Sequence, residues 1–89
     1  MSDSVTMDDV RATMECCKKV IEGRLREGQT LSVRPDMSYG KVGYWFDVYE
    51  NGTFKTQYKS KKGTKKECRD SLNALLDAIW FIEALENRI

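Results

Sequence analysis

The sequence predicts a single α+β domain: a helix, three antiparallel strands and a long C-terminal helix, in that order. Three observations lead to this prediction. Apolar residues recur every three or four positions near both ends of the chain, the middle of the chain alternates between apolar and polar residues, and an Asn-Gly dipeptide interrupts the alternation. The length of 89 residues suits one domain with one core, so we place a single αβββα binding domain over residues 1–89.

The first helix is expected over about residues 7–26, after a flexible segment at residues 1–5. Its apolar positions fall on one helical stripe: Met7, Val10, Met14, Cys17 and Ile21. Thr6 is a suitable N-cap, and Asp8 and Asp9 in the first turn interact favourably with the helix dipole. Either Gly23 or Gly28 ends the helix.

The three strands are expected at residues 30–34, 44–50 and 53–59. In the first strand Leu31 and Val33 alternate with polar residues, and Pro35 ends it because proline cannot continue a central ladder. A polar loop over residues 36–43 follows. Asn51 and Gly52 then join the other two strands as a hairpin, since this dipeptide is the strongest short-range hairpin signal.

The hairpin allows two registers, which place different side chains on the core face. A two-residue loop pairs Tyr49 with Phe54 and sets Asp47 among the aromatic residues of the core. A three-residue loop sets Asp47 opposite Lys55 on the outer face, and we prefer it because it avoids a buried charge. The preferred pairs are Val48 with Phe54, Phe46 with Thr56, and Tyr44 with Tyr58.

In the preferred register the outer face of the sheet carries two large aromatic residues among polar and charged ones: Trp45, Asp47, Tyr49, Lys55, Gln57 and Lys59. Such a face is either a binding surface or lies under other parts of the chain, here the 36–43 loop.

The second helix begins after Thr64, which can form a capping box with Glu67. Its inner stripe consists of Cys68, Leu72, Leu75, Leu76 and Ile79. Beyond Asp77 the helix is apolar on nearly all sides. We expect the first helix to cover part of this end, the alternative being a second subunit in a homodimer. A candidate protein interface is formed by Trp80, Phe81, Leu85 and Ile89.

The composition argues against catalysis, metals and cofactors. The chain has no histidine, and its three cysteines show no Cys-x-x-Cys spacing. Cys17 and Cys68 fall on the apolar stripes, where buried thiols are expected, and Cys16 is one position off the stripe. We therefore expect a protein that is not an enzyme and that binds no metal or cofactor.

The sequence also indicates where the protein works. The longest uncharged apolar run, residues 78–82, is too short to cross a membrane, and residues 1–7 contain no apolar segment typical of a signal peptide. We expect a cytoplasmic protein without membrane contact.

Charge is segregated along the chain. The net charge is +1, but residues 51–69 contain seven cations and one carboxylate, a local charge of +6. These cations are Lys55, Lys59, Lys61, Lys62, Lys65, Lys66 and Arg69. Several stand at a helix start, where free amide groups and the helix dipole add to the attraction for anions.

The strand residues Phe46 and Val48, the hairpin dipeptide and the run from Ser60 to Cys68 resemble the double-stranded RNA-binding domain. The resemblance extends over residues 44–79. It implies that the lysines opening the last helix hold phosphates across a groove. The residues that would do so are Lys65, Lys66 and Arg69, with Lys61 and Lys62 nearby. The 36–43 loop lacks the Gly-Pro pair and the histidine that the family carries there.

The aromatic strand pair followed by residues 64–67 is also similar to the arm-binding domains of phage-type integrases and to AP2-like domains. That similarity implies that the sheet itself enters a DNA groove. The contacting residues would then be Trp45, Tyr49, Lys55, Gln57 and Lys59.

Two functions follow as hypotheses. The first is a nucleic-acid-binding module that grips duplex phosphate. The second is a protein-interaction or inhibitor module, similar in size and style to phage accessory proteins such as anti-CRISPR inhibitors, which docks on a host protein complex or on itself.

Overall fold

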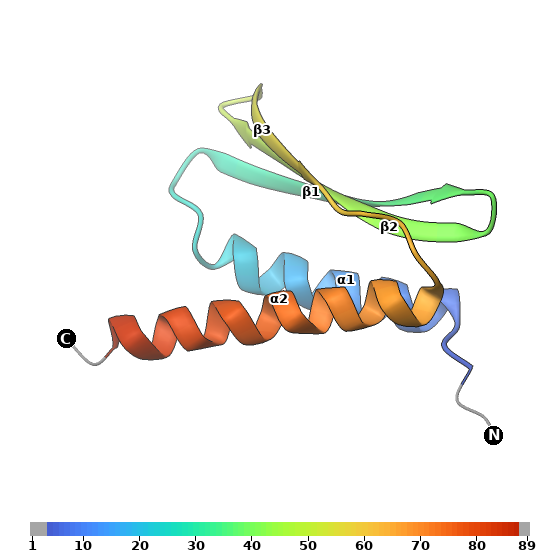
Figure 1. Cartoon of the computed structure of the whole chain (residues 1–89). Helices are drawn as coiled ribbons and strands as arrows, with labels where there is room; N and C mark the ends of the chain where they lie inside the picture. Colours follow the sequence, from blue (N-terminus) through green and yellow to red (C-terminus); the bar gives the residue numbers. More distant parts are fainter. Residues whose placement is uncertain (1–3, 88–89) are drawn as a thin grey trace.

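The chain forms a three-stranded sheet with two helices on one face. The computed structural model describes residues 4–87, so Ile89 and most of the segment expected to be flexible lie outside the described residues. The elements are α1 (Met7–Glu22), β1 (Gln29–Ser38), β2 (Lys41–Glu50), β3 (Thr53–Lys59) and α2 (Lys65–Glu86). The sheet is antiparallel with the order β1-β2-β3, and the two helices run in the same direction (Figure 1). The predicted αβββα fold is confirmed.

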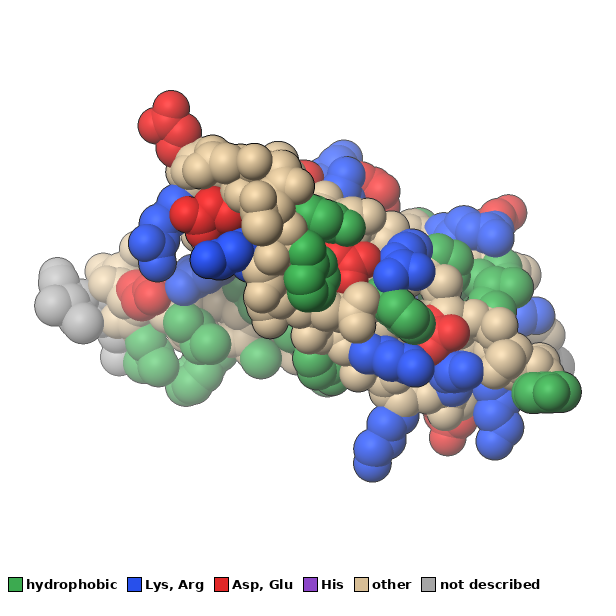
Figure 2. Space-filling model, turned by 90° about the horizontal axis from the view of Figure 1, so that it is seen from above, with side chains coloured by type: hydrophobic (Ala, Val, Ile, Leu, Met, Phe, Trp, Pro, Cys, Tyr) green, Lys and Arg blue, Asp and Glu red, His purple; other side chains and the backbone are tan. Residues whose placement is uncertain are grey.

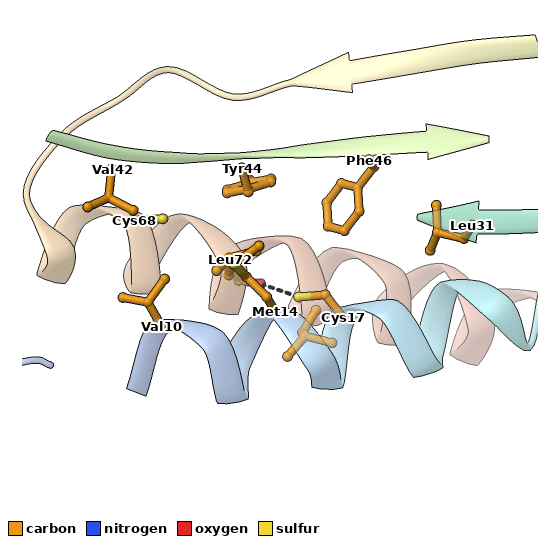
Figure 3. Close-up of a cluster of buried hydrophobic side chains, with 10 residues drawn as sticks. Val10, Met14, Cys17, Leu31, Val42, Tyr44, Phe46, Cys68 and Leu72 are labelled. Carbon is orange, nitrogen blue, oxygen red and sulfur yellow. Dashed lines mark hydrogen bonds between the residues drawn. The ribbon is translucent and has the colours of Figure 1, made fainter. Parts of the chain in front are cut away.

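The core lies between the helix pair and the first two strands. α1 packs on α2 and on β1, and α2 packs on β2. The buried apolar residues come from both helices and from β1 and β2 (Figure 3): Val10, Met14, Cys17, Leu31, Val42, Tyr44, Phe46, Cys68, Leu72 and Leu76. The Cys17 thiol donates a hydrogen bond of 3.4 Å to the Leu72 carbonyl. The predicted burial of Cys17 and Cys68 is confirmed.

Both predicted helix starts are confirmed by capping boxes. The Thr6 hydroxyl accepts from the Asp9 amide at 3.2 Å, and the Thr64 hydroxyl accepts from the Glu67 amide at 3.0 Å. Of the two glycines predicted to end the first helix, Gly23 is the C-cap, so α1 stops at Glu22 and is shorter than the expected range to about residue 26.

β1 continues through Pro35, so the predicted strand end and the predicted 36–43 loop are wrong. β1 is an edge strand, and proline is tolerated there because one side of the strand makes no ladder hydrogen bonds. The turn is instead the pair Tyr39 and Gly40, with φ of 51° and 74°. These positive values match a type I′ hairpin turn, which joins Ser38 directly to Lys41.

The preferred three-residue register of the second hairpin is also wrong. Asn51 and Gly52 form a two-residue turn with φ of 52° and 84°, and Tyr49 pairs with Phe54. Asn-Gly satisfies the type I′ geometry without strain, so the turn chemistry determines the register next to it.

A β-bulge follows this turn and corrects the facing of the strand. Lys55 is the extra residue, so it does not pair with Asp47, and Val48 pairs with Thr56. Asp47 lies opposite Gln57. Residues 56–59 therefore lie on the faces of the sheet that were predicted, although each pairs with a residue two positions later in β2 than expected. Only Phe54 moves to the outer face.

The expectation that α1 covers the end of α2 is wrong. α1 ends too early, and the exposed fractions in this part of α2 are 53% for Trp80, 64% for Phe81, 46% for Ile82 and 48% for Leu85. All seven residues of β3 are exposed as well.

Replacing Tyr39 with asparagine should stabilise the domain by about 1 kcal/mol, because asparagine tolerates the left-handed backbone that tyrosine adopts only at a cost. The Tyr39 side chain is fully exposed, so no packing is lost. Urea denaturation of both proteins measures the difference. A decrease in stability would contradict the assigned turn, and Tyr39→Phe, which keeps the strain, is the control.

Candidate nucleic-acid interface

The segment that joins β3 to α2 carries basic residues and is fixed against β2. The Tyr44 amide donates to Ser60 Oγ at 2.9 Å, and Val42 and Gly63 exchange two backbone hydrogen bonds of 2.8 and 3.0 Å. Gly43 makes this approach possible, because a Cβ at that position would lie 2.8 Å from Ser60 Oγ. The position of the basic residues beside α2 is therefore fixed by backbone contacts.

Three elements meet at the end of the molecule where α2 begins. A hollow of about 430 Å³ is lined there by Met7, Met37, Ser38, Tyr39, Gly40, Lys41, Val42 and Lys65. A second hollow, of about 410 Å³, lies between residues 60–63 and α2. We call the surface formed by residues 37–41 and 61–69 the basic end. Figure 2 shows lysine and arginine side chains gathered over this end of the molecule, at the lower right.

Three of the predicted phosphate-binding cations are paired with carboxylates inside the domain. Lys62 lies 3.7 Å from Asp36. Lys66 lies 2.8 Å from Asp70, and Arg69 lies 3.6 Å from the same carboxylate. The hydrogen bond from Lys66, with the charge of Arg69, lowers the pKa of Asp70, so this carboxylate stays ionised and reduces the net charge of the basic end.

Three exposed lysines of the basic end have no ion pair within residues 4–87: Lys41, Lys61 and Lys65. They stand on the β1–β2 turn, the segment before α2 and the first turn of α2. Beside them, Tyr39 presents a fully exposed ring from a left-handed backbone position. An exposed aromatic residue in a strained position is more often found at functional sites than elsewhere.

Trp45 and Lys59 belong to a different cluster, on the outer face of the sheet. The guanidinium of Arg34 lies 4.0 Å from the centroid of the Trp45 ring, and the Lys59 ammonium lies 5.1 Å from it. Asp47 is buried and accepts hydrogen bonds from Arg34 at 3.0 Å and from Gln57 at 2.6 Å. The cations and the carboxylate of this face therefore largely satisfy one another.

Asp36 adds a second carboxylate to the outer face. Its Oδ2 and the Trp45 Nε1 are both buried without a partner at hydrogen-bonding geometry. The indole is nevertheless close enough to lower the pKa of Asp36, and Lys62 and Lys59 act in the same direction. Among the other predicted contacts of this face, Tyr49 packs edge-on against Phe54 at 5.9 Å. Lys55 lies at the bulge near the β2–β3 turn, away from the basic end.

The buried thiols are poorly suited to nucleophilic chemistry. Burial, with a contribution from Cys16, raises the pKa of Cys17 to about 11. Burial also raises the pKa of Cys68, so both thiols stay protonated at neutral pH. Within the described residues no three metal-ligating side chains come together, and neither helix is long and apolar enough to span a membrane.

Comparison of the chain with protein family models, with curated proteins and with solved structures found no match. Function is therefore inferred from the residues of the basic end. Sequence reasoning missed two of them, Tyr39 and Lys41, because they were assigned to a polar loop. The glycine that follows Tyr39, between two alternating segments, is the signal that could have located the turn.

Replacing Asp47 with asparagine should lower the free energy of unfolding at neutral pH by about 1–2 kcal/mol, because Arg34 then lacks a charged partner. Hydrogen bonds from Gln57 and then Arg34 lower the pKa of Asp47 below 3.8 in the folded protein. The stabilisation is therefore present above pH 3.8 and is lost as the pH falls through the lower, folded-state pKa.

Urea denaturation at neutral pH and at about pH 2 measures this effect. The difference in stability between the original protein and the Asp47→Asn variant should narrow at the low pH, because below pH 3.8 the unfolded state takes up a proton at Asp47. A difference that stays constant between the two conditions would contradict the charge assignment.

Proposed function

We propose that this domain binds duplex nucleic acid without catalysing a reaction, and that it holds the phosphate backbone with its basic end. The observation that carries the proposal is the placement of Lys41, Lys61 and Lys65, none of them paired within residues 4–87, on three segments that line two hollows of the basic end. Each ammonium group is free to replace a counterion of the duplex.

The order and placement of the elements support a duplex as the ligand. A three-stranded sheet with two helices on one face is the arrangement implied by the resemblance to the double-stranded RNA-binding domain. Domains of that family contact two successive minor grooves and the phosphates between them. The corresponding parts of this chain, the turn between β1 and β2 and the start of α2, belong to one continuous surface.

The basic end is better suited to this role than the outer face of the sheet. The outer face holds Asp36 and Asp47, whose charges offset Lys62 and Arg34. A sheet entering a groove would bring these two carboxylates toward phosphate, which is unfavourable. The first turn of α2 instead presents Lys65, and helix geometry leaves the amides of Lys65 and Lys66 without an intrahelical partner, whereas the Glu67 amide is bound by Thr64.

Lysine contacts to phosphate imply binding with little sequence preference, because such contacts position a protein without reading bases. They also imply a strong dependence on salt. Three lysine contacts predict a log–log slope of roughly −2.7, so affinity should fall by roughly 40-fold between 50 and 200 mM salt.

Fluorescence anisotropy with labelled duplex RNA and duplex DNA at these two salt concentrations tests the proposal. Binding at the lower salt that weakens as stated would support it, and the ratio of the two affinities identifies the preferred duplex. Failure of both duplexes to bind at 50 mM salt, where counterion release favours binding most, would refute it.

A second candidate function is docking on a protein, including a host protein complex. The observation that favours it is the exposure of Trp80, Phe81 and Leu85 on α2, far from the basic end. In this case the basic end would meet acidic side chains of the protein partner instead of phosphate, and neither duplex RNA nor duplex DNA would compete with that partner.

A further inference from the structure

α2 carries two apolar stripes on opposite faces. The first contains Leu72 and Leu76 and is buried in the core. The second consists of Ala74, Ala78, Phe81 and Leu85, which are all exposed and are spaced by four, three and four residues. This spacing is that of a helix–helix seam. Hydrophobic side chains gather beside the C-terminal end of the molecule in Figure 2, at the lower left, opposite the lysines.

Two of the three carboxylates that the structure describes in this half of α2, those of Glu83 and Glu86, point away from the second stripe. Arg24 binds Glu86 with two hydrogen bonds of 3.1 Å and lies 3.5 Å from Glu83, so both carboxylates face the end of α1. The pKa of Glu86 is lowered by the hydrogen bond and charge of Arg24, which keeps this pair ionised. The third carboxylate, that of Asp77, is exposed and lies beside the stripe, one turn before Phe81. In an antiparallel pair about the centre of the stripe it stands at the level of the partner's Ile82 and not of the partner's Asp77.

We propose that a second copy of this chain covers the stripe, with the two α2 helices antiparallel. The reason is the order of residue sizes along the stripe, which runs from two alanines to two large residues. A two-fold axis midway between residues 79 and 80 places Ala74 opposite the partner's Leu85. It likewise places Ala78 opposite the partner's Phe81.

Every large side chain then meets a small one, and the surface is complementary to itself, as a two-fold interface requires. A parallel pair would oppose Phe81 to its own copy and leave space between the alanines. The antiparallel arrangement also aligns the helix dipoles favourably.

The exposed area sets the expected strength of the dimer. Four large apolar residues on or beside the stripe are each about half exposed: Trp80, Phe81, Ile82 and Leu85. Together they offer on the order of 400 Å² of apolar surface per subunit. Stable dimers bury about 800 Å² per partner, and weak ones less than about 600 Å². We therefore expect a weak, reversible dimer.

Sedimentation velocity between about 10 µM and 1 mM protein tests the proposal. The average mass should rise from 10.3 kDa toward twice that value with concentration. Phe81→Ser should weaken the dimer at least tenfold while leaving the circular dichroism spectrum unchanged, because the Phe81 side chain is 64% exposed. Phe54→Ser, at an aromatic residue on β3 that is 53% exposed, is the matched control and should dimerise normally.

Cysteine cross-linking in a Cys16→Ser background tests the orientation. A mixture of the Ala74→Cys and Leu85→Cys variants should form far more disulfide-linked dimer under mild oxidation than either variant alone. Cross-linking of each variant with itself, in preference to the mixture, would overturn the antiparallel arrangement. A protein that stays monomeric up to 1 mM would overturn the dimer altogether. No nucleic acid is present in these experiments and no residue of the basic end is changed, so their failure is distinguishable from failure of duplex binding.

Discussion

Replacing Lys61 and Lys65 together with glutamate should weaken duplex binding by roughly 100-fold or more. Each charged hydrogen bond to phosphate contributes about 1.5 kcal/mol or more, which corresponds to roughly tenfold in affinity, and glutamate adds repulsion. Both side chains are exposed and form no ion pair among the described residues, so the fold should not change. Anisotropy titrations of the original and double-variant proteins at one salt concentration measure the effect.

The matched control replaces Lys19 and Lys55 with glutamate. This variant has the same net charge as the first, but Lys19 stands in the last turn of α1 and Lys55 at the bulge of β3. Its affinity should fall only a few-fold, through the general loss of positive charge. Equal losses in the two double variants would mean that net charge and not the basic end governs binding. A larger loss in the control would place the interface on the sheet.

Replacing Leu72 with alanine should lower the free energy of unfolding by about 3 kcal/mol or more. Leu72 is 0% exposed and lies where α1, α2 and the sheet meet, so the lost side chain leaves a cavity that rigid neighbours cannot fill (Figure 3). A domain of this size has a total stability of about 5–10 kcal/mol, so the variant should unfold at a markedly lower urea concentration.

Leu72→Met is the control, because methionine conserves the volume and should cost less than about 1.5 kcal/mol. A loss of less than 1 kcal/mol for Leu72→Ala would contradict the packing of both helices on one face of the sheet.

The elements that the sequence predicted well are those whose signals are local. The capping residues Thr6 and Thr64 identify both helix starts, because a side-chain oxygen at that position accepts from an amide three residues later. The stripes that contain Cys17 and Leu72 identify the buried helix faces. β3 matches its predicted range because a turn dipeptide stands before it.

The elements that were missed depend on neighbours distant in sequence. Pro35 ends a strand only where both edges are paired, and the sequence does not reveal that β1 lies at the sheet edge. A bulge at Lys55 satisfies both the turn chemistry and the alternation of the strand, whereas the two registers weighed from the sequence each satisfied one of them.

The candidate site was predicted in part. The lysines at the start of α2 were identified from the local charge, but the pairing of Lys66 and Arg69 with Asp70 depends on side-chain geometry within α2 that composition does not reveal. Lys41 and Tyr39 reach the basic end only because two long strands carry their turn beside α2. The apolar excess at the end of α2 was recognised in the sequence, with the first helix or a second subunit as its expected cover, but Ala74 and Ala78 were not recognised as part of an exposed stripe.

Amide chemical-shift mapping of isotope-labelled protein during titration with the preferred duplex locates the duplex on the protein surface. The largest shifts should fall within residues 37–41 and 61–69, with little change in the second half of α2. Shifts concentrated on the outer face of the sheet, at residues 45–49 and 55–59, would contradict the assignment of the basic end. An unchanged spectrum at saturating duplex would contradict nucleic-acid binding itself.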